Sequence, residues 1–294
     1  MTWKRVATAA VLIPCVVGLV LWGSTALVAV GLALVILLAL FEYFALGDAI
    51  GHRGYRFWTA TCALLLVYVQ WLPTVMPSDY LNDWTRWERR YHHVWLFMHR
   101  PPGIPETLFI FVLGIAALTL GTRRPIVEAL PSAGISASGL LLVVFPLTYA
   151  IPLHGLEPDG PKLLLFALVI TWVGDTAAYF VGRAMGKHPL APVISPKKSW
   201  EGAIASIFGA LLVAVVFARW LTVPLAHLLA MAAAGNIAGQ TGDLVESAYK
   251  RSAGVKDSGS LLPGHGGVLD RIDALILAIP VVWYYWIWIY LPNR

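Results

Sequence analysis

Long apolar stretches run through most of this chain and restrict the folds that it can adopt. A helix needs about 20 apolar residues to cross a bilayer, and only helices or closed barrels satisfy their backbones in lipid. The stretches here are continuous rather than alternating, so they do not fit barrel strands. We predict nine transmembrane helices, at about 6–22, 25–46, 57–76, 105–121, 134–153, 163–184, 202–218, 221–243 and 272–291.

Composition places the chain in the same class. Hydrophobic residues make up 59% of the sequence and charged residues only 13%, whereas soluble domains carry about 25% charge. Cys15 and Cys62 lie in apolar segments, with no metal-site spacing and no disulfide framework. We therefore expect an all-α, polytopic integral membrane protein with one membrane domain, 1–294, in which 1–160 is mainly structural and 163–275 carries the chemistry together with two cytoplasmic loops.

Basic residues predict the orientation in the membrane. Lys4 and Arg5 precede the first apolar stretch, which places the N-terminus in the cytoplasm. The stretches 47–56, 122–133, 185–201 and 244–271 then also face the cytoplasm, and each carries Lys or Arg. The net charge of +5 suits a surface that faces anionic headgroups.

The segment 77–104 breaks this pattern, because it places arginines on the outer side. Its large aromatic residues fall at helical spacing with basic residues between them, which favours an amphipathic helix in the interface. An irregular aromatic-rich loop is the alternative. The aromatic residues concerned are Trp84, Trp87, Tyr91 and Trp95.

Two predicted helices carry polar residues within their apolar stretches. Asp175, Tyr179 and Gly182 share one helical face, and an acid at this depth usually faces the protein interior or a wet cavity. A structural ion pair between Asp175 and Arg183 is the alternative. In the eighth helix, small and polar residues recur every four positions, which suits either a site or a helix-packing seam. They are Gly235, Gly239, Asp243 and Ser247.

The stretch "KDSGSLLPGHGGVLDRID", 256–273, concentrates charge and glycine between the last two predicted helices. Gly264, Gly266 and Gly267 can adopt positive φ and expose backbone N–H groups to an anion. Asp243 and Asp270 lie at the ends of neighbouring helices, where they can converge on a hard cation such as Mg²⁺. Two further residues complete this hypothesis: Asp257 is a third ligand or orients Lys256.

Basic residues around this stretch suit phosphate binding. "SPKKSWEG", 195–202, places Lys197 and Lys198 on a proline-stiffened turn that resembles a phosphate clamp, although two lysines here also suit a topology signal. Further cations come from the last predicted loop: Lys250, Arg251, Lys256 and Arg271. Acids, bases and glycines at headgroup level, without a Ser-His-Asp or Cys-His arrangement, indicate phosphoryl chemistry on a lipid.

The stretch "SAYKRSAGVKDSGSLLPGHGGVLDRID", 247–273, resembles the signature of the phosphatidate cytidylyltransferases, also called CDP-diacylglycerol synthases. Every fixed position of Ser-x-x-Lys-Arg, Lys-Asp, Pro-Gly-His-Gly-Gly and Asp-Arg-hydrophobic-Asp is present. "GDLVES", "SPKKSWEG" and "DTAAYFVGRAMGKH" resemble further family blocks, so the resemblance covers about residues 170–275. Ser199 and Ala274 are mild departures from the family pattern, which often has Thr and Ser there.

The resemblance implies a reaction of CTP with phosphatidate that yields CDP-diacylglycerol and pyrophosphate in phospholipid biosynthesis. It implies Mg²⁺, with or without a second cation, a cavity that faces the cytoplasm and opens to lipid, a homodimer, and no nucleic-acid partner. A bacterial inner membrane fits such an enzyme. Asp243 and Asp270 would hold the metal, with Asp257 and Lys256 in catalytic roles. The substrate-binding residues would be Asp175, Lys197, Lys198, Ser247, Lys250, Arg251, His265, Gly266, Gly267 and Arg271.

Two other functions stay open at the level of sequence. A membrane enzyme that uses CTP to phosphorylate a polyprenol would need an alcohol nucleophile and therefore a general base. A transporter would also place acids inside the membrane. Its expected signature is a pair of broken helices in two related halves, which the sequence does not show.

Overall fold

The computed structural model describes residues 2–75, 102–122, 125–261 and 266–293 of the chain. Some sequence predictions fall outside these ranges and stay untested. They concern the proposed interfacial helix, with Trp84, Trp87, Tyr91 and Trp95, and the loop residues Gly264 and His265.

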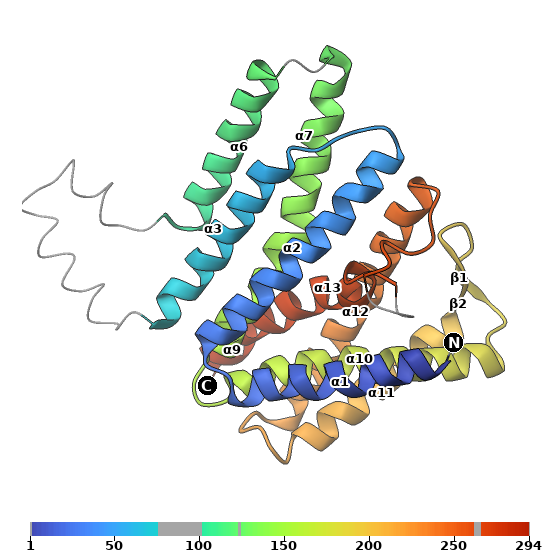
Figure 1. The fold of residues 1–294 in the computed structure, drawn as a ribbon. Helices are drawn as coiled ribbons and strands as arrows, with labels where there is room; N and C mark the ends of the chain where they lie inside the picture. The colour runs from blue at the N-terminus through green and yellow to red at the C-terminus, as the bar shows by residue number, and fades with distance from the viewer. Residues whose placement is uncertain (1, 76–101, 123–124, 262–265, 294) are drawn as a thin grey trace, which may run out of the picture.

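Helices form almost all of the described chain, and every predicted apolar stretch coincides with helical structure (Figure 1). The long helices are α1 (Thr2–Trp22), α2 (Thr25–Ala49), α3 (Arg56–Val75), α6 (Ile104–Gly121), α10 (Gly160–Met185), α11 (Trp200–Phe217), α12 (Leu225–Ser252) and α13 (Leu269–Tyr285). The shorter pieces are η1 (Ile126–Glu128), α7 (Ala129–Ser138), η2 (Gly139–Val144), α8 (Phe145–Thr148), α9 (Ala150–His154), η3 (Trp286–Tyr290) and η4 (Leu291–Asn293).

Seven helical segments in the described chain are long and apolar enough to cross a membrane. They are Thr25–Ala49, Arg56–Val75, Ile104–Gly121, Ile126–His154, Gly160–Met185, Trp200–Phe217 and Leu269–Tyr290. The apolar part of α1 is shorter, at Ala10–Trp22, and α12 is not among the seven. The all-α, polytopic prediction is therefore confirmed, but the count of nine spans is not. Polar residues such as Asn236, Gln240 and Asp243 account for the low hydropathy of α12.

Helix α12 extends further than the sequence predicted, and this changes the environment of several site candidates. It runs about two turns beyond residue 243, so much of the predicted loop 244–271 is helical. The side chains of Glu246 and Lys250 form an i,i+4 ion pair that supports this extension. The chain then turns at Gly254, whose φ of +70° suits a glycine just beyond a helix end.

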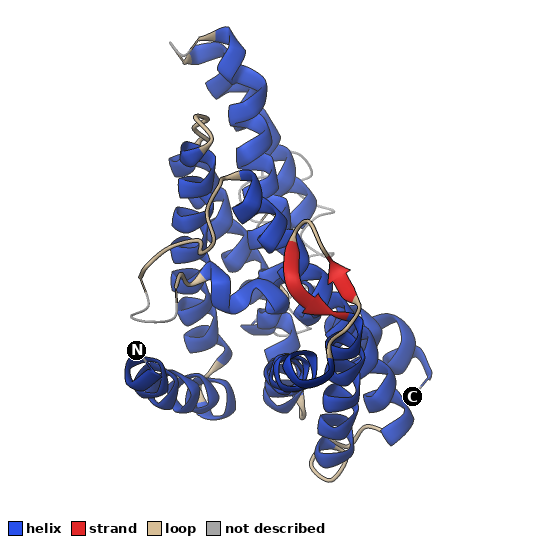
Figure 2. Cartoon of the chain, turned by 90° about the vertical axis from the view of Figure 1, so that its right-hand side faces the viewer, coloured by secondary structure: helices blue, strands red, loops and turns tan. Residues whose placement is uncertain are grey.

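A two-stranded hairpin, shown in red in Figure 2, connects α10 to α11. Strand β1 (Pro189–Ala191) pairs antiparallel with β2 (Ser195–Ser199), with Pro189 opposite Ser199. Lys197 and Lys198 therefore lie on a strand rather than on the predicted turn, because backbone pairing with β1 extends this segment. Ser199 ends the strand and begins α11, since its Oγ accepts a hydrogen bond from the N–H of Gly202.

Two helix pairs, α10 with α11 and α12 with α13, form most of the second half of the molecule (Figure 1). Small residues let α12 and α13 approach closely. A Cβ at Gly242 would lie 2.5 Å from the carbonyl oxygen of Asp273, and one at Gly239 would lie 3.3 Å from that of Ala274. The packing-seam alternative is therefore correct for one face of α12, while Asp243 lies on the face that borders a cavity.

Candidate active site

A cavity of about 750 Å³ lies between the second half of α10, the hairpin, the start of α11, the second half of α12 before its last turns, and the start of α13. Segments that are distant in sequence supply its charged lining. Its acids are Asp175, Asp243, Asp270 and Asp273. Its bases are Arg183, Lys197, Lys198 and Arg271. The cavity therefore brings together residues of all four regions that the sequence singled out: the polar face of α10, the polar positions of α12, "SPKKSWEG" and the glycine-rich stretch.

Three of the acids form a connected negative surface. Asp175 on α10, Asp243 on α12 and Asp273 on α13 interact electrostatically with one another. Lys198 and Arg271 act on Asp175 in the opposite sense. A cluster of carboxylates at this depth is costly unless cations compensate it, so the arrangement favours a positively charged occupant or partner.

Lys198 forms an ion pair with one of these acids, Asp243. Its Nζ lies 2.6 Å from Oδ2 of Asp243, and each side chain keeps about a quarter of its surface exposed, at 27% and 28%. The Oγ of Ser247 donates to the other oxygen of Asp243, at 3.4 Å. The hairpin thus carries Lys198 across to α12, where a lysine and a carboxylate together line the cavity.

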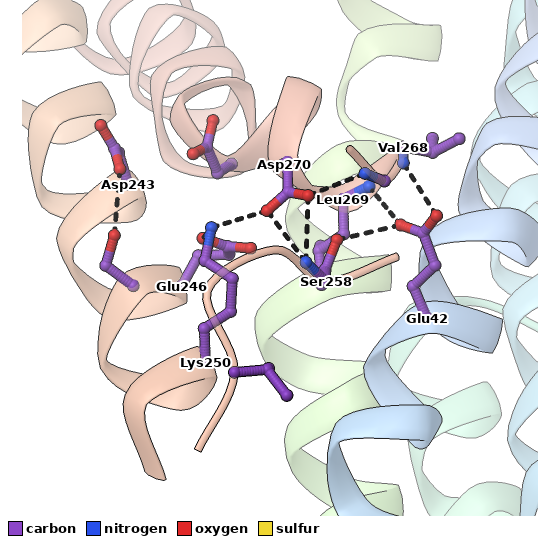
Figure 3. A network of polar contacts seen from close by, with 12 residues as sticks. Glu42, Asp243, Glu246, Lys250, Ser258, Val268, Leu269 and Asp270 are labelled. Carbon is purple, nitrogen blue, oxygen red and sulfur yellow. Dashed lines mark hydrogen bonds and ion pairs between the residues drawn. The ribbon is translucent and has the colours of Figure 1, made fainter. Parts of the chain in front are cut away.

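Asp270 is held mainly by the protein itself (Figure 3). It accepts hydrogen bonds from Nζ of Lys250 at 2.6 Å, from the N–H of Ser258 at 3.0 Å and from the N–H of Gly267 at 2.8 Å. Its side chain is only 6% exposed. Asp270 begins α13 as predicted, but its oxygen atoms already have strong donors.

Lys250 differs from its predicted role as a phosphate ligand. Its Nζ lies between Oε2 of Glu246, at 2.5 Å, and Oδ1 of Asp270, at 2.6 Å, and its side chain is 10% exposed. The ammonium group is therefore paired with two buried carboxylates. Because α12 continues past residue 243, Lys250 lies between helices rather than in a solvated loop, and it holds Asp270 in place.

The glycines of the signature also differ from the prediction of an open anion cradle. Gly266 has the expected positive φ, +81°, and a Cβ there would lie 2.7 Å from Oδ2 of Asp270. The N–H of Gly267 donates to Asp270 rather than pointing to an open site. The positive φ was correctly predicted for Gly266 but not for Gly267, and Gly264 lies outside the described residues. At Gly267 a carboxylate of the protein takes the place of the ligand anion.

Three further predicted site residues lie outside the lining of the cavity, as do Ser247, Lys250, Gly266 and Gly267. Lys256 and Asp257 are exposed on the segment that follows α12. Arg251 is also exposed, and it donates to the carbonyl oxygens of Ile194, at 3.3 Å, and Val255, at 3.0 Å. Arg251 therefore ties the hairpin connection to the end of α12.

Asp175 lines the cavity, as one of the two readings of the sequence predicted. The alternative was an ion pair with Arg183. The guanidinium of Arg183 instead donates to Oη of Tyr179, at 3.0 Å, and both of these side chains line the same cavity.

An amide network closes the end of the cavity that lies between the helices. Nδ2 of Asn236 donates to Oγ of Ser206 at 3.0 Å, and Nε2 of Gln240 donates to Oδ1 of Asn236 at 2.8 Å. Gln240 also donates to the carbonyl oxygen of Ala203, at 3.2 Å. Partnered amides are tolerated at this depth, so this end of the cavity is polar and rigid.

Sequence reasoning missed two acids near the cavity. Asp273 follows Asp270 by three residues and shares its helix face, so helical spacing alone could have found it. Glu42 on α2 contacts the signature segment from the other half of the chain, and no local pattern marks it.

The cavity contains side chains of the kind that bind hard cations, but the described residues do not form a metal site. In the described ranges, no group of three or more His, Cys, Asp or Glu side chains is arranged to bind a metal. The donor chemistry still fits, since Asp175, Asp243 and Asp273 present carboxylate oxygens to one cavity, and such oxygens are the ligands that Mg²⁺ prefers.

Comparison with known proteins gives an independent line of evidence. The model of the cytidylyltransferase family matches residues 3–289. A phosphatidate cytidylyltransferase of Haemophilus influenzae is 43% identical over 144 residues, which is 47% of this chain and 48% of the relative. Those of Bacillus subtilis and Brucella suis are 43% identical over 138 residues and 41% identical over 182 residues. These alignments cover 46% and 60% of this chain and 51% and 63% of the two relatives.

The chain thus spans about half the length of the first curated relatives it matches. The family match is longer and takes in nearly every helix, from α1 to the end of α13. It also includes all of the acids and bases that line the cavity. The chain therefore belongs to the cytidylyltransferase family.

Proposed function

We propose that this protein is a phosphatidate cytidylyltransferase, which transfers CMP from CTP to phosphatidate and releases pyrophosphate. One observation carries the proposal: the signature acids of α12 and α13 and Lys198 of a separate sequence block line a single cavity. The names of the relatives support the same substrates. Polyanionic substrates need a site of this kind, with cations from several elements around one space.

The chemistry of the reaction explains why the site needs no general base. The nucleophile is a phosphate monoester oxygen, which is largely dianionic at pH 7 because its second pKa is about 6. This oxygen forms a bond to the α-phosphorus of CTP while the bond to the β-phosphate oxygen breaks, and pyrophosphate leaves. The barrier is the approach of two anions, so Lys197, Lys198, Arg183 and Arg271 would act by neutralising phosphate charge.

We propose Mg²⁺ as the cofactor, with Asp243 and Asp270 as the expected ligands. The cavity adds Asp175 and Asp273, whose carboxylates are available on its wall. Asp270 keeps its bonds to Lys250, Ser258 and Gly267 in the structure, so Asp243 and Asp273 offer the less constrained pair. A bound Mg²⁺ would neutralise charge on the transferring phosphoryl group.

The position of the cavity also suits a lipid substrate. It lies at the ends of membrane-length helices, where a lipid phosphate would reside while its acyl chains stay in hydrocarbon. Exposed apolar side chains on α10 and α11 lie next to its lining residues and would face those chains. They are Phe180, Ile204 and Phe208.

The described helices make the protein a multi-pass membrane protein by length and composition. We propose in addition that it resides in a bacterial inner membrane with the cavity facing the cytoplasm. The basic residues at 185–201 and 244–271 support this orientation under the positive-inside rule. The homodimer implied by the family resemblance stays a prediction.

The direct test is release of pyrophosphate by the purified, lipid-reconstituted protein. We expect release only when CTP, phosphatidate and Mg²⁺ are all present. CTP labelled at the α-phosphate should leave its label in lipid, whereas γ-label in lipid would identify a kinase. Absence of lipid product with any label, combined with uptake into proteoliposomes, would identify a transporter instead.

A further inference from the structure

Glu42 lies in the last third of α2, in the half of the chain that carries none of the signature residues. It is 2% exposed, and all three of its hydrogen-bond donors come from the signature segment (Figure 3). The N–H of Val268 donates at 3.0 Å, the N–H of Leu269 at 2.8 Å and Oγ of Ser258 at 3.1 Å. Residues more than 200 positions apart in the sequence are therefore in contact next to Asp270, which lines the proposed active site.

Through these contacts, Glu42 of α2 caps the N-terminus of α13. α13 begins at Leu269, and its N-cap residue Val268 makes no side-chain capping bond. The first N–H groups of a helix lack internal partners and carry the positive end of the helix dipole. Glu42 satisfies two of these N–H groups with one carboxylate, which also compensates the cost of burying its charge.

The signature segment is also shaped around this carboxylate. A Cβ at Gly267 would lie 2.3 Å from Oε2 of Glu42, and a Cβ at Gly259 would lie 2.6 Å from Oε1. Such distances are not possible for real side chains. Glycine at these two positions is therefore what allows the segment to close on Glu42.

Glu42 and Asp270 both accept hydrogen bonds from Ser258 and from the segment 267–269. Ser258 donates to Glu42 through its hydroxyl and to Asp270 through its backbone N–H. On the other side, Leu269 donates to Glu42, and Gly267 donates to Asp270. Asp270 lines the cavity, whereas Glu42 does not, so any effect of Glu42 on the reaction passes through the position of Asp270 and the start of α13.

We propose that Glu42 is a positioning residue of the active site, which fixes the start of α13 and thereby the carboxylate of Asp270 and the side chains that follow it. This inference rests on the proposed function for its catalytic consequence. Its structural part, the clamp on Ser258, Val268 and Leu269, does not depend on that function.

The test is Glu42→Gln in the full-length, lipid-reconstituted protein. The amide keeps the size of the side chain but replaces one acceptor oxygen with a donor, which then faces N–H or O–H groups. We expect kcat for pyrophosphate release to fall about 10- to 100-fold, as for residues that orient ligands of a site, with a much smaller change in KM for CTP. Hydrogen exchange at the amides of Val268 and Leu269 should accelerate at least about tenfold, which matches the loss of roughly 1.4 kcal/mol of protection.

Glu128→Gln is the matched control, because Glu128 also joins two elements through a contact with His52, at 3.2 Å, and lines no part of the cavity. Its turnover and its exchange at residues 268 and 269 should equal those of the wild type. Glu42→Asp keeps the acceptors but shortens the side chain, and we expect it to recover part of the turnover lost in Glu42→Gln.

Two outcomes would overturn the proposal. One is Glu42→Gln with wild-type exchange at Val268 and Leu269. The other is faster exchange with unchanged kcat in an active enzyme. If the wild type releases no pyrophosphate, the proposed function fails, while the exchange measurement still decides whether the clamp exists. If Glu42→Gln does not fold, Ser258→Ala removes the hydroxyl contact alone and should raise exchange and lower kcat to a smaller extent.

Discussion

At the scale of single residues, the acids of the cavity divide into two kinds. Asp270 is saturated with donors from Lys250, Ser258 and Gly267. Asp273 lies one turn further along α13, lines the cavity, and interacts electrostatically with Asp175 and Asp243. We infer that Asp270 organises the start of α13, while Asp243 and Asp273 are better placed to meet a cation.

This division predicts that turnover depends on the charge of Asp273. Asp273→Asn should lower turnover at least about 100-fold, because a carboxylate that holds Mg²⁺ keeps positive charge beside the transferring phosphate, and such a charge contributes roughly 3 kcal/mol to the transition state. Raising the Mg²⁺ concentration should recover part of the loss. The measurement is pyrophosphate release over a range of Mg²⁺ concentrations.

Asp48→Asn provides the control, since Asp48 pairs with Arg56 on other helices and lies outside the cavity. It should retain wild-type turnover and wild-type Mg²⁺ dependence. Normal activity of Asp273→Asn would remove Asp273 from the site and return the role to Asp243 and Asp270 alone.

At the scale of elements, the hairpin β1–β2 delivers cations to a site that is otherwise built by helices. Lys198 crosses from β2 to Asp243 on α12, at 2.6 Å. Arg251 in turn fastens the hairpin connection to α12 through the carbonyl oxygen of Ile194. Two contacts therefore hold the hairpin against α12: one from Lys198 of the hairpin and one from Arg251 of α12.

Lys198→Ala should weaken binding of the nucleotide more than it slows the chemical step. One charge-assisted hydrogen bond contributes about 1.5–3 kcal/mol, so we expect KM for CTP to rise about tenfold or more. Steady-state kinetics with varied CTP is the measurement. Lys187→Ala is the matched control, because Lys187 is exposed just after α10 and does not line the cavity. Equal kinetics for both variants would argue against a phosphate contact at Lys198.

At the scale of the whole molecule, the two halves of the chain meet at the signature segment. Glu42 on α2 contacts residues 258–269, and the cavity opens beside them on α10 to α13. The hairpin forms part of the cavity wall, so the two lie on one side of the molecule. Orientation of the hairpin in the membrane therefore determines the face to which the site opens.

A cysteine label can establish this orientation. Val193 lies between the two strands and is 91% exposed, so Val193→Cys should react with a membrane-impermeant maleimide. We expect labelling in inverted inner-membrane vesicles and none in intact spheroplasts, because basic segments stay on the cytoplasmic side. The wild type gives the background: Cys62 is buried, and Cys15 is exposed but lies in the apolar part of α1. Labelling in spheroplasts alone would reverse the proposed orientation.

The sequence alone was sufficient for the class of protein, the approximate positions of the apolar helices and the family, but not for the number of spans or the end of α12. Apolar length is a local property, because lipid forces each spanning segment to satisfy its own backbone. The signature is equally local, so Asp243, Asp270 and Lys198 could be selected without coordinates, and the structure brings them to one cavity. Helix spacing would also have found Asp273.

Only the tertiary structure decided which donors these residues meet. Lys250 turned inward because α12 continues past the predicted membrane boundary. Gly267 donates to Asp270, not to a ligand, and Glu42 became part of the site although no neighbouring residue marks it. These outcomes depend on packing between segments up to 227 residues apart, where burial forces each polar group to find a partner. No local pattern in the sequence records which partner that is.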